Sequence, residues 1–467
     1  MQNRRDFLKT LAAGGAACAV GGCASQRPWL LGTGVAGSPM HRYAASPLKH
    51  VRVGVVGIGS RGTAVIWRLS RLPNVTVTAV CDRIADKTDG ARKLSVKLKR
   101  PEPKAYVGEE AWKRLCDDPD VDVVYNTTPW LLHVPVQLHA MKCGKHVFTE
   151  VPSAFTVDEC WELVETSERT KRHCMQLENC CYGEIEMLTF NLARLGMLGE
   201  LVHGEGAYIH DLRCICGTGA SEKDHWRFVH NREHAGNAYP THGLVPLCLT
   251  MDVNRGDRLD YLVSLDSKQA NFKAYMDAKL SADNPRRNAK IAMADMNSSL
   301  IRTVGGKSIL LQHDVATPRP YSRIQFLSGT KGAICDYPYR VAFEKAPGAG
   351  AHEWFKEAEA EEIRAKYRHP LWKTVGELAK RVGGHGGMDF IMDARWVYCL
   401  QQGIPLDMDV YDLAATSCIC ELTEKSARNR SKAVEIPDFT RGAWRTNPKM
   451  EIVDIDLSKF GVMSSGA

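Results

Sequence analysis

Two short stretches near the middle of the chain combine tyrosine with histidine, residue types that can move protons at neutral pH. They read Tyr208-Ile-His210-Asp-Leu-Arg213 and Tyr239-Pro-Thr-His242-Gly. If the first is a strand, its period of two directs Tyr208 and His210 to the same face. A phenol beside an imidazole is suited to general acid–base chemistry. Such residues at the rim of a sheet also serve simply to pack and to hydrogen-bond, and the residues alone leave both interpretations open.

Other polar clusters accompany this pair. They are Glu178-Asn179, Trp226-Arg227, Pro318-Arg-Pro-Tyr321 and His385-Gly-Gly-Met-Asp389. A structural metal is not expected, because the closest cysteine pairs lack the paired Cys-x-x-Cys spacing of a zinc site. Those pairs are Cys180-Cys181, Cys214/Cys216 and Cys418/Cys420.

A nucleotide site is predicted near the amino terminus of the fold. A valine-rich run from Val51 leads into Gly57-Ile-Gly59-Ser-Arg-Gly62, and a helical pattern follows. This glycine spacing makes a tight strand-to-helix turn that admits a pyrophosphate against free N–H groups. A second apolar strand ends in Cys81-Asp82, where a carboxylate suits the ribose diol of NAD and repels the 2′-phosphate of NADP. Arg83 is the one neighbour that would suit that phosphate.

Residues 1–30 are predicted to be an export signal, because Arg4-Arg5 followed by a short apolar stretch matches the twin-arginine pattern. The apolar stretch is too short to span a bilayer. Val20-Gly-Gly-Cys23 resembles a lipoprotein cleavage box. Two outcomes stay open: a lipid anchor at Cys23, or plain cleavage and release into the periplasm. Twin-arginine export carries folded proteins, so the 16 cysteines are expected to be buried thiols and the cofactor to be loaded beforehand.

The rest of the sequence is predicted to form a linker at 31–47 followed by two domains. With 467 residues, 44% of them hydrophobic, the chain can bury two cores, and its net charge of +7 forms no basic stripe suited to nucleic acid. Residues 48–175 alternate strands and helices, as expected for a doubly wound parallel (Rossmann) sheet of the α/β class. Residues 176–450 predict an α+β domain with a mostly antiparallel sheet. Its elements include a strand at 323–327 and a helix at 410–426.

Five motifs in order resemble those of one known family. The glycine turn, Asp82 and Glu150-x-Pro152 look like the Gfo/Idh/MocA oxidoreductases. Within that group, the motifs at Glu150, Glu178, Tyr208, Tyr239 and His385 closely resemble glycoside hydrolase family 109, which comprises NAD-dependent α-N-acetylgalactosaminidases. The resemblance runs from about residue 50 to Trp444 and includes the twin-arginine leader.

The resemblance implies a retaining exo-glycosidase that acts on glycans with terminal α-linked N-acetylgalactosamine. Bound NAD⁺ takes a hydride from carbon 3 of the sugar, and the ketone acidifies the proton on carbon 2. The aglycone then leaves by elimination, water adds, and the hydride returns. Such a route needs no pair of catalytic carboxylates, unlike most glycosidases.

The same resemblance implies the site residues. Cofactor contacts fall on Gly57, Gly59, Ser60, Arg61, Gly62, Asp82, Trp130, Leu131, Leu132, His133, Glu150, Val151 and Asn179. Sugar contacts fall on Tyr208, Arg227, Tyr239, Pro240, Thr241, His242 and Tyr321. For catalysis, His242 or Tyr239 is expected at the carbon-3 hydroxyl. Tyr208 or His210 is expected at the carbon-2 proton and the leaving group.

Two other functions remain open at this point. One is a Gfo/Idh/MocA-type sugar oxidoreductase, or an NAD-dependent glycosidase with another sugar specificity. Against a dehydrogenase of the usual type stands Val151, which occupies the position of the lysine that deprotonates the alcohol in most such enzymes. The other is a sensor that binds NAD or sugar without turnover. Whether the chain forms a homo-oligomer is also open.

Overall fold

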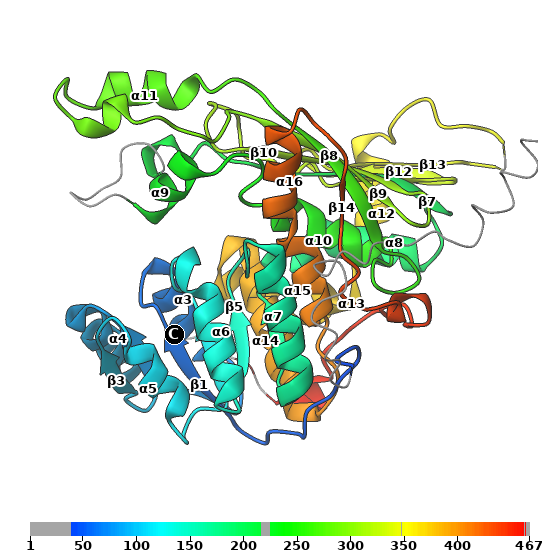
Figure 1. Cartoon of the computed structure of the whole chain (residues 1–467). Helices are drawn as coiled ribbons and strands as arrows, with labels where there is room; N and C mark the ends of the chain where they lie inside the picture. The colour runs from blue at the N-terminus through cyan, green and yellow to red at the C-terminus, as the bar shows by residue number, and fades with distance from the viewer. Residues whose placement is uncertain (1–38, 216–224, 347, 462, 464–467) are drawn as a thin grey trace, which may run out of the picture.

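The computed structural model describes residues 39–215, 225–346, 348–461 and 463 (Figure 1). The predicted export signal, with Cys23, and residues 31–38 of the predicted linker lie outside the described residues. Among the described residues, no helix has the length and apolar character needed to cross a bilayer.

The first sheet is built from six parallel strands in the order β3-β2-β1-β4-β5-β6. These are β1 (Val51–Val56), β2 (Val75–Asp82), β3 (Lys104–Val107), β4 (Val123–Asn126), β5 (His146–Thr149) and β6 (Cys174–Gln176). The central strands are runs of valine and other apolar residues because helices cover both faces of the sheet. This strand order is that of a dinucleotide-binding Rossmann domain, so the predicted fold is confirmed.

Helices from both ends of the chain cover this sheet. The connecting helices are α3 (Ser60–Leu69), α4 (Ala85–Lys97), α5 (Ala111–Asp117), α6 (His133–Lys142) and α7 (Val157–Thr170). A helix from far along the chain, α14 (Met388–Gln402), packs against β1 and α3 (Figure 1). Its Trp396 ring lies 4.9 Å from that of Phe148 and 6.3 Å from that of Tyr125. The core of the nucleotide domain therefore includes residues that the linear division at 175/176 assigns to the second domain.

The second sheet has eight strands in the order β13-β12-β11-β7-β10-β9-β8-β14. Only β7 and β10 pair in parallel. The strands are β7 (Leu201–Ile209), β8 (Leu259–Asp266), β9 (Asn297–Thr303), β10 (Ser308–Asp314), β11 (Phe326–Gly329), β12 (Gly332–Cys335), β13 (Arg340–Phe343) and β14 (Val434–Glu435). The mostly antiparallel sheet predicted for this half of the chain is confirmed.

Helix α10 (Thr241–Thr250) packs directly on β7. The two backbones approach so closely that a Cβ on Gly243 would lie 2.3 Å from the amide nitrogen of Ala207. Glycine at this contact lets the start of α10, which carries His242, lie beside the end of β7, which carries Tyr208. The other helical segments are α8 (Glu184–Arg194), α9 (Trp226–Glu233), α11 (Asn271–Lys279), α12 (Glu357–Tyr367), α13 (Pro370–Val382), α15 (Val410–Ser417), α16 (Ile419–Arg428) and α17 (Leu457–Phe460), with short 3₁₀ turns at η1 (Trp130–Leu132), η2 (Asn179–Tyr182), η4 (Pro285–Asn288), η5 (His385–Gly387) and η6 (Ala443–Arg445).

Two predicted elements are wrong in their bounds. The strand expected at 323–327 begins only at Phe326, because Ile324 and Gln325 have φ of 61° and 49° and so leave the extended conformation. The helix expected at 410–426 is divided at Cys418 into α15 and α16. The two halves pack on different domains, α15 on α7 and α16 on β8, which requires a change of direction between them.

Candidate active site

The turn between β1 and α3 is shaped for a phosphate group. A Cβ on Gly62 would lie 2.1 Å from the carbonyl oxygen of Gly57, so only glycine allows this packing of helix on strand. A Cβ on Gly59, by contrast, would meet nothing within 4 Å, because the turn faces open space there. Helix α3 begins at Ser60 with no side-chain cap and no acidic residue in its first turn. Its first N–H groups are thus free for a pyrophosphate, as a dinucleotide requires.

Asp82 stands at the carboxyl end of β2, where the adenosine ribose of a dinucleotide is expected. Its carboxylate accepts hydrogen bonds from the backbone N–H groups of Ile58, at 2.8 Å, and Ile84, at 3.0 Å. This clamp holds the side chain at the edge of the glycine turn. Arg83 points elsewhere, with its Nη1 3.5 Å from a carboxylate oxygen of Glu109. The fixed carboxylate of Asp82 and the pairing of Arg83 with Glu109 both favour NAD over NADP.

Arg61, the residue after Ser60, links two acidic side chains from distant parts of the chain. It donates to Glu150 at 2.6 Å and to Asp389 at 2.6 Å. Asp389 also accepts from Asn179 at 2.5 Å and contacts His385 at 3.0 Å. Burial by itself raises the pKa of Asp389, but the His385 hydrogen bond and the charge of Arg61 outweigh it and hold that pKa well below its usual range. Burial also raises the pKa of Glu150, and Arg61 opposes that rise only in part.

The segment after β4 presents Trp130 to both domains. Its indole N–H donates to the carbonyl of Val151 at 3.3 Å, and its ring lies 4.5 Å from that of Trp226. Val151 is buried and apolar, so no titratable group occupies the position where dehydrogenases of this fold carry lysine. Leu131 is 84% exposed, and Leu132 is half-buried.

The predicted cofactor residue His133 is fully buried beneath this segment. Its Nδ1 lies 2.8 Å from the carbonyl oxygen of Pro152 and its Nε2 lies 2.9 Å from that of Thr128. Burial lowers the pKa of His133 to about 4. The ring therefore ties together the loops that follow β4 and β5, and its contribution to a cofactor site is to position them.

The predicted sugar-binding rings gather in one cluster. The ring of Tyr208 lies 4.5 Å from that of Tyr239, 5.3 Å from that of His242 and 6.4 Å from that of Tyr321. The Tyr208 hydroxyl is 3.1 Å from Nδ1 of His210, so the two residues predicted as a pair are hydrogen-bonded. Burial, and next the charge of Arg227, lowers the pKa of His210, which favours its neutral form.

Glu178 was named from the sequence only as part of a motif, without a role in the site. Its carboxylate is fully buried and lies 2.7 Å from Nδ1 of His242, and it also accepts the N–H of Cys180 at 3.0 Å. Burial by itself raises the pKa of Glu178, but the interaction with His242 prevails and the pKa is lowered. An ionised Glu178 accepts a hydrogen bond from the N–H at Nδ1, which leaves the lone pair of Nε2 of His242 available for chemistry. The only sequence signal was the Glu178-Asn179 motif.

The other predicted sugar contacts surround these rings. The Arg227 guanidinium lies 4.7 Å from the centre of the Trp130 ring and 5.2 Å from that of Tyr239. Pro240 and Thr241 are buried and begin α10. The Tyr321 hydroxyl accepts from Arg323 at 2.9 Å.

A cavity of about 400 Å³ adjoins Trp130, Phe155 and Trp226. Neither Tyr208 nor His242 lines it, but Trp130, whose ring lies 6.0 Å from that of Tyr239, borders both the cavity and the ring cluster.

The fold and this site define a class: a two-domain NAD-binding enzyme built on the Gfo/Idh/MocA plan. Residues 51–177 match the model of the oxidoreductase family with an NAD-binding Rossmann fold. Solved structures with this fold include levoglucosan dehydrogenase in complex with NADH and levoglucosan, at a TM-score of 0.62 and 18% identity over 83% of this chain and 100% of that one. An NAD-binding oxidoreductase from Klebsiella pneumoniae aligns at a TM-score of 0.64 and 17% identity over 84% of this chain and 100% of that one.

Residues 182–446, more than half of the chain, match the model of the glycosyl hydrolase 109 C-terminal domain. An α-N-acetylgalactosaminidase from Bacteroides fragilis is 46% identical over 406 residues, which cover 86% of this chain and 95% of that protein. A glycosyl hydrolase family 109 protein from Shewanella amazonensis is 42% identical over 453 residues, covering 97% and 99%. The chain belongs to glycoside hydrolase family 109. Residues 1–21 match the twin-arginine signal model, which supports export by that pathway.

Proposed function

We propose that this protein hydrolyses terminal α-linked N-acetylgalactosamine from glycans or glycoconjugates, with a tightly held NAD as a temporary hydride store. The observation that carries the proposal is the buried Glu178–His242 pair beside the hydrogen-bonded Tyr208–His210 pair. The name of the Bacteroides fragilis relative supports the choice of sugar. Val151 argues against net dehydrogenation, because that position offers no proton acceptor.

Three observations support the fit of the cofactor residues to NAD. The turn is open at Gly59, helix α3 begins at Ser60 without a side-chain cap, and the Asp82 carboxylate is held by a backbone hydrogen bond. When bound, NAD supplies reversible hydride acceptance at the sugar. The ion pairs of Arg61 with Glu150 and Asp389 fix the start of α3 to the loop after β5 and to α14.

We assign His242 rather than Tyr239 to the carbon-3 hydroxyl. Because Glu178 accepts from Nδ1, Nε2 has a lone pair available to take the hydroxyl proton, and Glu178 then stabilises the imidazolium. Tyr239 is less suited to act as a base, since burial raises the pKa of its hydroxyl well above the ordinary value. Its hydroxyl is better suited to donate a hydrogen bond to the sugar.

We assign the Tyr208–His210 pair to the carbon-2 proton and the leaving group. The neutral form of His210, favoured by its lowered pKa, can accept a proton passed on by Tyr208. The same pair can return a proton to the departing aglycone oxygen. The Arg227 guanidinium, stacked over Trp130 and Tyr239, offers planar donors to the sugar at this face.

The test uses the purified protein with p-nitrophenyl α-N-acetylgalactosaminide in deuterated water, without added cofactor. We expect release of p-nitrophenol and solvent deuterium at carbon 2 of the released sugar. Activity should fall when the nucleotide is stripped and should return when NAD⁺ is added back.

Three results would overturn the proposal. Equal cleavage after complete removal of nucleotide would exclude the hydride store. A product without deuterium at carbon 2 would exclude elimination. Accumulation of reduced nicotinamide with free sugar, and no glycoside cleavage, would instead identify an oxidoreductase. A panel of aryl glycosides run in parallel checks the sugar preference.

A further inference from the structure

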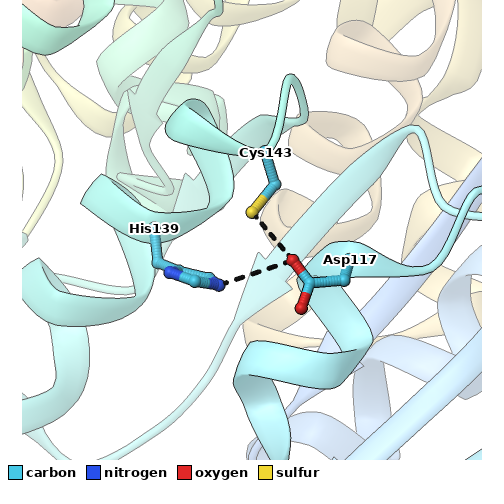
Figure 2. A group of neighbouring side chains, drawn as sticks. All are labelled: Asp117, His139 and Cys143. Atoms are coloured by element: carbon cyan, nitrogen blue, oxygen red, sulfur yellow. Dashed lines mark hydrogen bonds and ion pairs between the residues drawn. The ribbon is translucent and has the colours of Figure 1, made fainter.

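Three side chains with metal-binding atoms point toward one another on the outside of the nucleotide domain (Figure 2). Asp117 is the last residue of α5, while His139 and Cys143 lie at the end of α6. The Cys143 sulfur is 3.1 Å from Oδ1 of Asp117, and His139 Nε2 is 3.7 Å from the same oxygen. One carboxylate oxygen, one imidazole nitrogen and one sulfur all lie within 4.8 Å of one another.

The two ligands from α6 have the spacing that a helix needs to present both to one ion. Cys143 follows His139 by one helical turn, and its N–H donates to the His139 carbonyl at 2.9 Å. The third ligand comes from a neighbouring helix, since α5 packs directly on α6. An ion bound here would therefore link α5 to α6 at their carboxyl-terminal ends.

Two observations separate this group from an ordinary surface hydrogen bond. The Nε2 atom of His139 is buried and has no hydrogen-bond partner in the described structure, although it faces the Asp117 carboxylate. The Lys145 amine, from the loop that follows α6, donates to the carbonyls of Asp118 and Val121 at 2.8 Å each. Its hydrogen bonds are therefore directed to the backbone and not to the Asp117 carboxylate.

We propose that Asp117, His139 and Cys143 form a site for a divalent cation of the zinc type. Zinc bonds of about 2.0 to 2.3 Å place tetrahedral ligand atoms about 3.3 to 3.6 Å apart. The sulfur-to-oxygen distance of 3.1 Å, a hydrogen bond from the Cys143 thiol, is shorter than this, and the nitrogen-to-oxygen distance of 3.7 Å is longer, so an ion would replace the thiol proton and shift the side chains slightly. A mixed sulfur, nitrogen and oxygen set selects zinc over calcium or magnesium, which prefer oxygen ligands. The Asp117 side chain is 63% exposed, so water can take the fourth position.

This site is distinct from the catalytic one. Asp117 and Cys143 lie at the carboxyl-terminal ends of their helices, whereas cofactor residues such as Trp130 precede the amino-terminal end of α6. The sequence predicted no structural metal because it lacks paired Cys-x-x-Cys motifs. A site with a single cysteine ligand does not produce that motif, so the sequence argument did not address it. We infer a structural role in which the ion fixes α5 to α6.

The experiment titrates the full-length protein, treated with a chelator and then dialysed, with Co²⁺ followed by Zn²⁺. Cobalt is used because a thiolate ligand gives a sulfur-to-cobalt charge-transfer absorption. We expect one equivalent of Co²⁺ to produce that band and Zn²⁺ to abolish it. The variants are Cys143→Ser, His139→Gln and Asp117→Asn, and Cys335→Ser is the control because its thiol is also half-buried.

The proposal expects the band in the wild type and in Cys335→Ser and its loss in Cys143→Ser. It also expects Zn²⁺ affinity to fall about tenfold or more in His139→Gln and Asp117→Asn. Two results overturn it: no band in the wild type, or a band of equal strength in Cys143→Ser. Asp117→Asn changes an exposed side chain and should fold normally. If a folded Asp117→Asn protein, checked by circular dichroism, binds Zn²⁺ like the wild type, the proposal also fails.

Discussion

Replacing Glu178 with glutamine tests the proposed role of His242 with almost no change in shape. In the native protein the carboxylate is fully buried, and it lies 2.7 Å from Nδ1 of an imidazole whose side chain is 13% exposed. Glutamine keeps an oxygen that can accept the N–H of Cys180, but it carries no charge. Its amide can also donate to Nδ1, which would move the imidazole proton to Nε2 and remove the base.

The size of the effect follows from the kind of bond that is lost. A hydrogen bond to a charged partner contributes about 1.5 to 3 kcal/mol. The bond between Glu178 and His242 strengthens when the imidazole takes a proton, so this amount is lost mainly from the transition state. It corresponds to a roughly 10- to 150-fold lower kcat. KM for the glycoside should change little, because Glu178 does not face the sugar.

The assay is steady-state release of p-nitrophenol from the α-N-acetylgalactosaminide, with bound NAD measured in the same preparations. Asp407→Asn is the matched control. Asp407 is a buried carboxylate in an ion pair with Arg395, and it bonds Tyr182 rather than any predicted sugar contact. Thermal unfolding of both variants measures the general cost of removing a buried charge.

Three outcomes would refute the reasoning about Glu178. One is a kcat within about twofold of wild type, which would remove His242 as the base that Glu178 supports. Another is a loss of NAD that accounts for the whole loss of rate, because the effect would then lie in the cofactor site. A loss of kcat equal to that of the control would also count against a specific role.

Three further predictions follow from the cofactor and sugar sites. Asp82→Ala should weaken NAD binding by about tenfold or more, since a charged acceptor for the ribose is lost; wild-type nucleotide content after purification would contradict this. Arg227→Lys should lower kcat/KM about two- to tenfold because lysine cannot stack or donate as a planar group, while Arg232→Lys on the same helix should have little effect on the same assay. Asp389 has a pKa lowered in the folded state, so its contribution to stability is present above the unfolded value near pH 4 and is lost as pH falls below it. Asp389→Asn should destabilise the protein at neutral pH by about 1.5 to 3 kcal/mol, since it removes one of the two carboxylates that pair with Arg61 and leaves only Glu150. Its melting temperature should depend less on acid pH, and a parallel pH curve for wild type and variant would contradict the assignment.

The nucleotide domain is the part of the fold that local patterns predict best. A valine-rich run, glycines at 57, 59 and 62, and Asp82 at the next strand end each depend on residues close in the chain. In the second domain, the same kind of reasoning missed the left-handed residues Ile324 and Gln325. Both are compatible with a strand by type, and only their tertiary surroundings place them at positive φ.

By itself, the sequence determined the class of fold, the cofactor turn and the set of tyrosine and histidine motifs, because periodicity and turn chemistry are properties of neighbouring residues. The tertiary structure alone decided which side chains meet. Glu178 contacts His242, and Arg61 contacts Asp389, only because the order of the strands and the packing of the helices bring distant segments together. Local pattern does not encode such partners, since each pair is separated by elements whose arrangement depends on the packing of the whole chain.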